Sequence, residues 1–373
     1  MHSVRLHYTL SHRDDNDTAL KTEAALLRHP LMDLLQAVDQ KGSISAAARE
    51  LNLSYRHVWG ELKRWEDVLG HELIVWEKGQ SAKLTEFGNK LMWAERQTQA
   101  RLAPQLEALR ADLERTFAVA FDPAAHVLTL YASHDDALPR LREQAATAGL
   151  HLDIRFCGSV DAIRALNEGR CEIAGFHTLS QPHPKSLSAI TYKPLFKPGH
   201  HKLIGFAKRT QGLLVKAGNP LNVRSLADVV SGRFRYVNRG LGTGTRLLLD
   251  ELLSNQSIKP EQLKGYERQE LSHSAVATCI ASGQADAGLA IESAALAAGL
   301  DFIPLVTENY WLACLKSALD SPPVAALRQH LSGHDWQNTL QAMPGYQANP
   351  SGNVHSLRKE LPWWNLKPRK IPD

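Results

Sequence analysis

Residues 42–88 read GSISAAARELNLSYRHVWGELKRWEDVLGHELIVWEKGQSAKLTEFG, and this stretch decides the architecture of the amino-terminal part of the chain. Ser43 precedes a helical run of small residues, and Ser54 opens a second helix directly after the tight turn LNLS. The segment ELIVWEKGQSAKLT is typical of two short strands joined by a turn at Lys78 to Ser81. This order predicts a helix-turn-helix followed by a β-hairpin wing.

The second helix of this stretch has one apolar and one polar side. Val58, Leu62 and Trp65 recur at helical spacing and should face the core, whereas the first turn exposes polar residues. In a helix-turn-helix this first turn reaches base edges, so we predict that the chain binds double-stranded DNA. The predicted DNA-binding residues are Ser43, Ser45, Ser54, Tyr55, Arg56, His57, Lys63, Arg64, Lys78 and Lys83. A helical protein-interaction module is the alternative, but such an interface favours apolar anchors at the exposed positions.

A long helix is expected after Leu84 and Thr85, running to about Arg115, with apolar residues at steps of three, four or eight. Such a helix cannot bury its apolar stripe within a small domain, so a partner helix is implied. We therefore expect a homodimer or homotetramer, with the winged module in residues 1–84 and a linker and dimerisation helix in residues 85–120.

The bulk composition sets further limits. A length of 373 residues predicts two to three domains, and a net charge of +4 permits a nucleic-acid partner without requiring one. The four cysteines lie far apart without a C-x-x-C pair, so neither a disulfide framework nor a zinc site is indicated. We find neither an apolar secretion signal nor a membrane span, and we expect a cytoplasmic protein with no membrane partner.

From about residue 121 onward the pattern changes to repeated strand, turn and helix, which predicts an α/β domain with a mainly parallel sheet. Ligands of such sheets bind beyond the carboxyl ends of the strands. Residues 212–229 are expected to cross into a second lobe and residues 285–305 to return. This assigns residues 121–350 to a two-lobed ligand-sensing domain and residues 351–373 to a carboxyl-terminal tail.

The segment VNRGLGTGTR (237–246) looks like a phosphate loop, but its G-x-G-x-G spacing matches neither the dinucleotide fingerprint nor the P-loop. What remains is the end of a strand at 233–237, a turn rich in backbone N–H groups, and a helix that opens at about Thr245. Free amides and a positive helix end make such a turn an anion cradle.

Polar residues occur at several predicted strand-to-helix turns, which should converge on one cleft. These turns are 132–138, 157–162, 176–180, 207–212, 237–246 and 270–276. The candidate ligand-binding residues on them are Ser133, His134, Asp135, Ser159, His177, Arg209, Gln211, Arg239, Gly242, Thr243, Gly244, Thr245, Arg246 and His273. We predict no catalytic residue and no metal ligand.

Residues 29–115 resemble the winged helix-turn-helix of LysR-type regulators and, more closely, that of molybdate-responsive repressors. The resemblance is carried by G-S-I-S-x-A-A, by the L-S-Y turn, by Trp59 four residues after Tyr55, and by L-T-E-F-G entering the long helix. The glycine run in the wing of those repressors is replaced here by KGQSAK. Minor-groove contacts by the wing therefore do not carry over.

Residues 127–346 resemble the type II periplasmic-binding-protein-like domains found beside molybdenum-cofactor biosynthesis enzymes and in their regulators. The turn around Arg239-Gly240 and Thr243-Gly244-Thr245 is similar to the RG-x-x-SGT turns of tungstate-binding proteins. The resemblance implies a bound molybdate or tungstate, or a molybdopterin-type ligand. Bare oxyanions take chiefly neutral donors, whereas three arginines and three histidines would suit a larger phosphate-bearing anion, so both remain open.

Together these features predict a ligand-responsive transcriptional regulator that is not an enzyme. One alternative is an enzyme or cofactor-binding protein of molybdenum-cofactor metabolism that uses the same cleft. The wrong glycine spacing, together with the lack of G-x-S-x-G and H-E-x-x-H motifs, argues against catalysis. A transport binding protein is disfavoured by the fused DNA-binding module and by the absence of a secretion signal.

Overall fold

The structure is a computed structural model that describes residues 29–75, 81–121, 126–348 and 351–364. By its internal contacts the chain divides into two compact units, Met1–Ala103 and Pro104–Asp373. Lys78, one of the predicted DNA-binding residues, lies outside the described residues.

The first unit is a winged helix-turn-helix, as predicted. Its elements are α1 (Pro30–Lys41), α2 (Ile44–Glu50), α3 (Tyr55–Leu69), β1 (Ile74–Val75), β2 (Lys83–Leu84) and the beginning of α4 (Glu86–Phe121). The Ser43 hydroxyl accepts from the backbone N–H of Ala46 at 3.0 Å, and that of Ser54 accepts from His57 N–H at 3.1 Å. These two caps start α2 and α3, and β1 pairs antiparallel with β2.

One small apolar core holds this unit together. Leu35, Val38, Ala47, Val58 and Leu62 are fully buried in it, and they come from α1, α2 and α3. Val58 and Leu62 lie one helical turn apart, so the helical spacing of the sequence correctly identified the buried side of α3.

The second unit is built on a mixed ten-stranded sheet. In sequence, its strands are β3 (His126–Ala132), β4 (Leu150–Phe156), β5 (Ile173–Leu179), β6 (His201–Val215), β7 (Tyr236–Arg239), β8 (Gln269–Glu270), β9 (Ala287–Ile291), β10 (Asp301–Leu315), β11 (Tyr346–Gln347) and β12 (Val354–Ser356). The main strands are ordered β4-β3-β5-β10-β6-β9-β7-β8, and β11 and β12 pair with β6.

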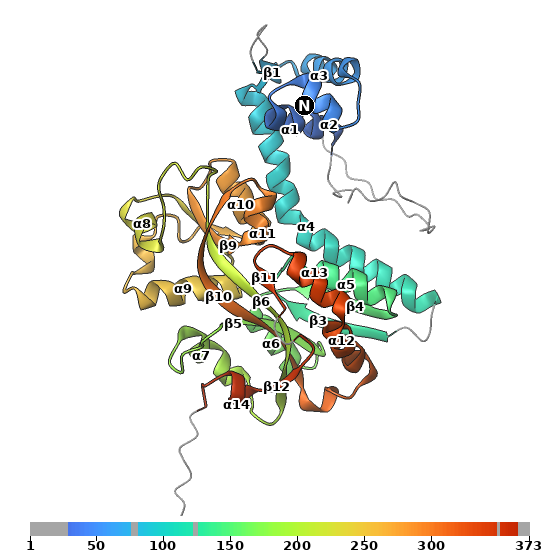
Figure 1. Cartoon of the computed structure of the whole chain (residues 1–373), viewed down its shortest axis with the longest axis vertical. Coiled ribbons are helices and arrows are strands. Elements are labelled where there is room, and N and C mark those ends of the chain that lie inside the picture. The colour runs from blue at the N-terminus through green and yellow to red at the C-terminus, as the bar shows by residue number, and fades with distance from the viewer. Residues whose placement is uncertain (1–28, 76–80, 122–125, 349–350, 365–373) are drawn as a thin grey trace, which may run out of the picture. The chain divides into compact units, whose positions relative to one another are not determined.

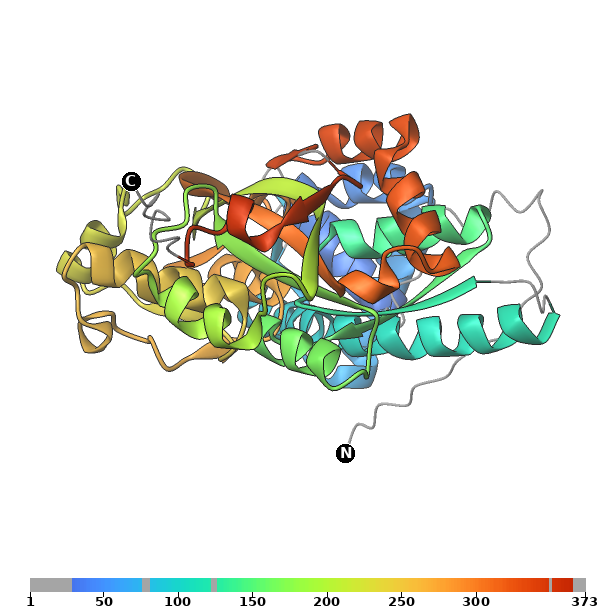
Figure 2. The ribbon, with the colours of Figure 1, turned by 90° about the horizontal axis from the view of Figure 1, so that it is seen from below.

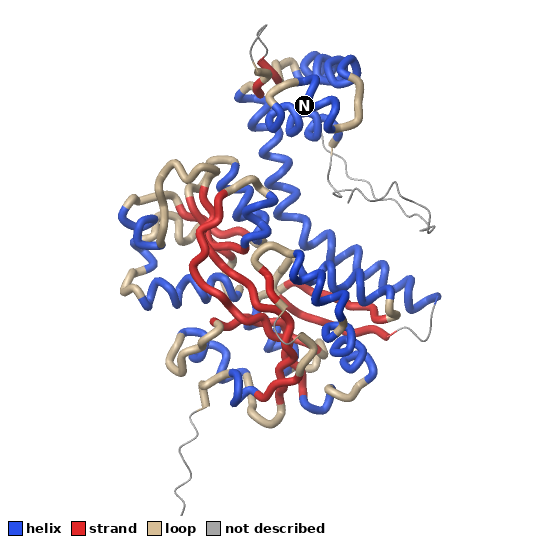
Figure 3. Tube along the Cα trace, viewed as in Figure 1, coloured by secondary structure: helices blue, strands red, loops and turns tan. Residues whose placement is uncertain are grey.

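Two long strands, β6 and β10, run antiparallel through the whole sheet (Figures 1 and 3). The 308–313 half of β10 pairs with β5, which belongs to a first lobe with β3 and β4. The last five residues of β6, 211–215, pair with β9, which belongs to a second lobe with β7 and β8. The β6–β10 register is irregular between Pro304 and Val306 and between Tyr310 and Trp311, close to where the lobes meet.

Three sequence predictions about this sheet need correction. The expected mainly parallel sheet is mixed, because both connecting strands run antiparallel to their neighbours. The segments 176–180 and 207–212 were predicted as strand-to-helix turns, but residues 176–179 belong to β5 and all of 207–212 belongs to β6. The lobes are connected through the strands β6 and β10 themselves, which lie partly outside the predicted crossovers 212–229 and 285–305.

Helices cover both faces of this sheet (Figure 2). They are α5 (Ala137–Thr147), α6 (Ser159–Asn167), α7 (Leu187–Tyr192), α8 (Leu226–Ser231), α9 (Gly244–Asn255), α10 (His273–Ala281), α11 (Glu292–Ala297), α12 (Pro322–Ser332), α13 (His334–Ala342) and α14 (Leu357–Glu360). In β3, Leu128 and Leu130 face the cluster that contains α5 and α12, whereas Tyr131 faces the cluster that contains α6. This alternation is that of a strand with helices on both sides.

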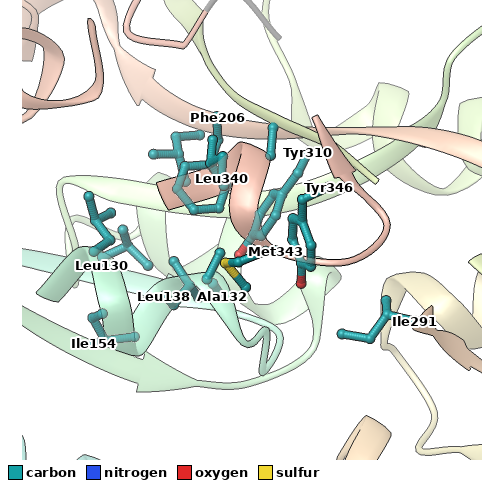
Figure 4. Close-up of a cluster of buried hydrophobic side chains, with 14 of the residues drawn as sticks. Leu130, Ala132, Leu138, Ile154, Phe206, Ile291, Tyr310, Leu340, Met343 and Tyr346 are labelled. Carbon is teal, nitrogen blue, oxygen red and sulfur yellow. The ribbon is translucent and has the colours of Figure 1, made fainter. Parts of the chain in front are cut away.

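Aromatic side chains fill the centre of the larger cluster (Figure 4). Phe206 stacks on Trp336 with ring centroids 5.5 Å apart, and it meets Tyr310 edge-on at 4.7 Å. Tyr346, on β11, lies in the same cluster. Tyr310 and Tyr346 thus carry hydroxyl groups into the apolar core, at the part of the molecule where β6 and β10 pass from one lobe to the other.

Candidate functional site

The first turn of α3 presents the predicted DNA-binding side chains to solvent. Ser54, Tyr55, Arg56 and His57 are all exposed, as is Ser45 on α2. Tyr55 keeps 47% of its surface exposed and stacks on Trp59 with a centroid distance of 6.5 Å. The turn therefore offers an aromatic ring, an arginine and a histidine at the position from which a recognition helix reads bases.

The remaining cations of this module are partly neutralised by neighbours on α3. Lys63 donates to Glu66 at 2.6 Å and lies over the Trp59 ring, and Arg64 donates to Glu61 at 2.6 Å. Burial disfavours the charged form of Glu66, but hydrogen bonds from Lys63 and from the backbone of β1 outweigh burial and lower its pKa. Lys83 on β2 is exposed. Ser43 and Ser54 use their hydroxyls as helix caps, so their first role is structural.

In the second unit, the turn between β7 and α9 starts the helix one residue earlier than the sequence predicted. Thr243 is the N-cap: its hydroxyl accepts from Arg246 N–H at 3.3 Å and donates to Gly240 O at 2.8 Å. Gly242 has φ +80°, which glycine adopts without strain. The turn thus places the amino-terminal end of a twelve-residue helix against residues of the first lobe.

Glycines allow the two lobes to touch at this turn. A Cβ at Gly158, before α6, would lie 2.6 Å from the carbonyl oxygen of Gly242, and one at Gly244 would lie 2.7 Å from Cδ2 of His177. On the first lobe, the hydroxyls of Ser133 and Ser159 are 3.2 Å apart and both are buried. The structure therefore brings Ser133, Ser159 and His177 to the same place as the Gly242–Gly244 turn.

Arg209 of β6 is the hub of a buried polar network. Its guanidinium donates to both Asp135 and Glu308, and all three side chains are at most 2% exposed. Gln211 links the same Glu308 to the second lobe: its Nε2 is 2.9 Å from Glu308 Oε1 and 3.0 Å from the hydroxyl of Thr245. Arg209 and Gln211 are thus held by protein groups at the junction of the lobes.

Other groups complete this network. Tyr346 donates its hydroxyl to Asp135 at 2.9 Å, and Asp135 also accepts from the backbone N–H of Ala137, which starts α5. His177 Nε2 lies 3.4 Å from Arg209, and its ring packs on Tyr310 with centroids 4.0 Å apart. Asp135 therefore accepts from the first amide of α5 and is an ion-pair partner of Arg209 at once.

Arg239, at the end of β7, is a buried cation with unsatisfied donors. It is 1% exposed, and its Nε and Nη1 have no acceptor among the described residues. Burial, reinforced by the charge of Arg209, lowers the pKa of Arg239 to about 9. A guanidinium in this situation is stabilised by any anion that enters within hydrogen-bonding distance.

The predicted histidines belong to the same neighbourhood. Burial, with the charges of Arg209 and Arg239, lowers the pKa of His177 well below its ordinary value, and the same influences act on His273. His134 packs on Phe156 with ring centroids 4.9 Å apart. At neutral pH, His177 and His273 are therefore neutral groups and do not add positive charge.

Acid should destabilise the protein through these two histidines. Because their folded-state pKa values lie below the ordinary value of about 6.5, the unfolded chain binds more protons below that pH, and stability falls as the pH drops. We expect a loss of up to about 1.4 kcal/mol per pH unit for each histidine. Urea denaturation between pH 7.5 and 5 measures this slope. The slope of unfolding free energy against pH should be shallower in the double variant His177→Gln, His273→Gln than in the exposed-site control His126→Gln. Equal slopes would contradict the claim that these two buried histidines cause the loss of stability in acid.

One predicted ligand residue points elsewhere, and others were missed. The Arg246 guanidinium lies 3.8 Å from the ring centroid of Tyr266 and 3.5 Å from Asp250, so it packs on its own lobe instead of joining Arg239. Sequence reasoning missed Glu308, the partner of Arg209 across the β6–β10 ladder. It also missed Asp136, which accepts from Ser293 on α11 at 2.7 Å and whose pKa is raised by burial.

Residues 141–332, more than half of the chain, match the family model of the PBP superfamily domain. The chain belongs to this superfamily. Residues 30–89 match the bacterial regulatory helix-turn-helix protein family of the lysR type. This PBP superfamily member therefore carries a LysR-type module ahead of its larger domain, and the predicted fold class is confirmed.

Three individual proteins illustrate these similarities. An uncharacterised protein, YvgK of Bacillus subtilis strain 168, is 32% identical over 200 residues, which are 54% of this chain and 64% of that protein. The molybdenum-pterin-binding protein MopB of Rhodobacter capsulatus is 34% identical over 84 residues, 21% of this chain and 31% of MopB. The crystal structure of full-length CbnR complexed with its target DNA matches with a TM-score of 0.40 and 16% identity, covering 80% of this chain and 97% of CbnR.

At the level of the family, LysR-type proteins are transcriptional regulators and not enzymes, as the sequence predicted for this PBP superfamily member. The chain spans 64% of the length of its Bacillus relative. Across the described ranges, no helix combines the length and the apolar content that crossing a bilayer requires.

Proposed function

We propose that this LysR-type regulator binds operator DNA through α3 and responds to a small tetrahedral oxyanion, molybdate or tungstate, held between the two lobes of its PBP domain. The observation that carries the proposal is Arg239, a buried guanidinium with unsatisfied N–H groups on the last residue of β7, the strand that leads into the Gly242–Gly244 turn. Its role on chromosomal DNA would place the protein in the cytoplasm.

The neighbours of Arg239 favour a bare oxyanion over a pterin-type anion. Arg246 packs on Tyr266, and Arg209 is already bound by two carboxylates, so Arg239 is left as the main cationic donor. The other candidate donors of the site are neutral, namely the hydroxyls of Ser133 and Ser159 and the amides of the turn. The similarity to MopB, whose name states that it binds a molybdenum pterin, supports a ligand that contains molybdenum.

Thermal denaturation with added oxyanions tests this function directly. Molybdate or tungstate should raise the melting temperature in a concentration-dependent way, because a ligand that binds only the folded state stabilises it. Sulfate and phosphate at the same concentrations are the comparison anions. The absence of any shift with either metal oxyanion would overturn the proposed ligand class.

A substitution at Arg56 should separate base recognition from general DNA affinity. If Arg56 contacts a base, Arg56→Ala should reduce the preference for operator over random duplex by about 1–3 kcal/mol. The control Arg64→Ala, on a residue expected to contact phosphate, should weaken binding to both duplexes alike. Fluorescence anisotropy at several salt concentrations measures both effects, and unchanged selectivity in Arg56→Ala would refute the base contact.

We also propose that the carboxyl-terminal half of α4 pairs with the same helix of a second copy. Leu109, Leu113, Phe117 and Phe121 recur at four-residue steps and keep 59%, 44%, 43% and 85% of their surfaces exposed. A stripe of large apolar side chains along one helix face is typical of a helix–helix interface. The regulator would then act as a homodimer, or as a homotetramer built from such dimers, reading two half-sites.

A further inference from the structure

Two buried carboxylates hold the guanidinium of Arg209 next to the proposed oxyanion site. Asp135 of the first lobe binds Nη1 and Glu308 of β10 binds Nε, and the side chains of both acids are at most 2% exposed. Glu308 also accepts from Gln211 and lies 3.7 Å from His177 Nδ1. Arg209 is therefore bound on two sides by the protein itself.

The ionisable side chains of this neighbourhood include Asp136, whose charge acts on Arg239 and whose pKa is raised by burial. Arg209 and Arg239 are positive, Asp135 and Glu308 are negative, and His177 is neutral at pH 7 because burial and the nearby arginines depress its pKa. An incoming anion therefore meets one arginine with unsatisfied donors, Arg239, while the charge of Arg209 is compensated by two carboxylates. In a buried site, each further unit of charge changes the interaction with an anion strongly.

We propose that Glu308 and Asp135 determine which anion charge the site accepts, by binding Arg209 so that Arg239 is left as the main cation for the ligand. This inference deepens the proposed function and rests on it. Neither carboxylate contacts the anion in this account. Each is a positioning residue that acts through Arg209, and its charge limits how strongly the site favours a dianion over a monoanion.

The test compares two tetrahedral oxyanions of similar size and different charge, tungstate with two negative charges and perrhenate with one. Dissociation constants for both are measured by isothermal titration calorimetry on the full chain, for the wild type and for Glu308→Gln. The glutamine keeps the shape and an acceptor for Gln211 but removes one negative charge. Asp135→Asn removes one charge from the other side of Arg209 and serves as the independent second variant.

In both variants the preference for tungstate over perrhenate should rise about tenfold, because one added positive charge acts twice as strongly on the dianion. If the carboxylate had a purely structural role, its removal would instead weaken the binding of both anions by the same factor. The ratio of the two dissociation constants would then stay unchanged. The matched control is Asp286→Asn, which removes a carboxylate from the surface pair with Arg235 and should leave the ratio as it is.

The outcomes separate this inference from the function on which it rests. If the wild type binds tungstate and the ratio stays constant in Glu308→Gln and Asp135→Asn, the charge-setting role is wrong while the oxyanion site stands. If only one of the two variants changes the ratio, local geometry and not charge is responsible, and the inference also fails. If the wild type binds neither anion, both the inference and the proposed ligand class are overturned.

Discussion

Replacing Arg209 with methionine should lower the free energy of unfolding by about 3–5 kcal/mol at neutral pH, the typical effect of removing one partner of a buried ion pair. The reason is that Asp135 and Glu308 would remain buried as carboxylates without their shared cation. Tyr346 and Gln211 would still donate one hydrogen bond to each, but neutral donors do not replace the lost charge. Urea denaturation followed by circular dichroism measures the loss.

The matched control is Arg235→Met. Arg235 also makes an ion pair with a carboxylate, at 2.6 Å to Asp286, but its side chain is 48% exposed and water screens the pair. We expect a change within about 1 kcal/mol for this control. Equal losses in the two variants would mean that burial of the Arg209 network contributes nothing special to stability.

Replacing Arg239 with glutamine should have the opposite profile, with loss of ligand binding and no loss of stability. Without its guanidinium the site loses its unsatisfied cationic donors, so tungstate affinity should fall about a hundredfold, the usual effect of removing one side of a buried charged pair. In the ligand-free protein, a buried cation whose Nε and Nη1 lack acceptors among the described residues is itself unfavourable. The melting temperature without ligand should therefore stay the same or rise.

Calorimetry with tungstate and melting curves without it check both halves of this prediction. DNA binding of Arg239→Gln in the absence of oxyanion is the matched control and should be unchanged, because the helix-turn-helix is in the other unit. Tungstate affinity within about threefold of the wild type would place the ligand away from Arg239. A clear drop in the melting temperature would show that an unrecognised partner normally satisfies this guanidinium.

Local sequence signals were enough for the helix-turn-helix and for the turn between β7 and α9. Ser43 and Ser54 act through bonds to residues three positions later, and Val58 and Leu62 lie one turn apart, so a short window contains all the information. The same holds for Thr243, which caps α9 through Arg246 N–H. Features of this kind depend on neighbours along the chain, and they were predicted within one or two residues.

The interior of the ligand-binding unit could not be predicted in this way. Polar residues within 207–212 suggested a turn, because a strand that carries an arginine and a glutamine does not look buried. The partner of Arg209, Glu308, lies 99 residues away in sequence, and the partner of Gln211, Thr245, lies 34 residues away. The environment of Arg246 could not be predicted for a related reason, since its position near a helix start does not reveal that its guanidinium packs on the ring of Tyr266.

The position of β10 between β5 and β6 has a consequence for how the protein becomes native in the cell. β5 and β6 follow each other in sequence, yet the edges that face each other across the sheet stay unpaired until β10 is inserted between them. A nascent chain on the ribosome must therefore keep two strand edges unpaired while all of the second lobe is translated. Unpaired strand edges can pair with other chains and so promote aggregation. We therefore expect chaperone binding to matter most at this stage of synthesis.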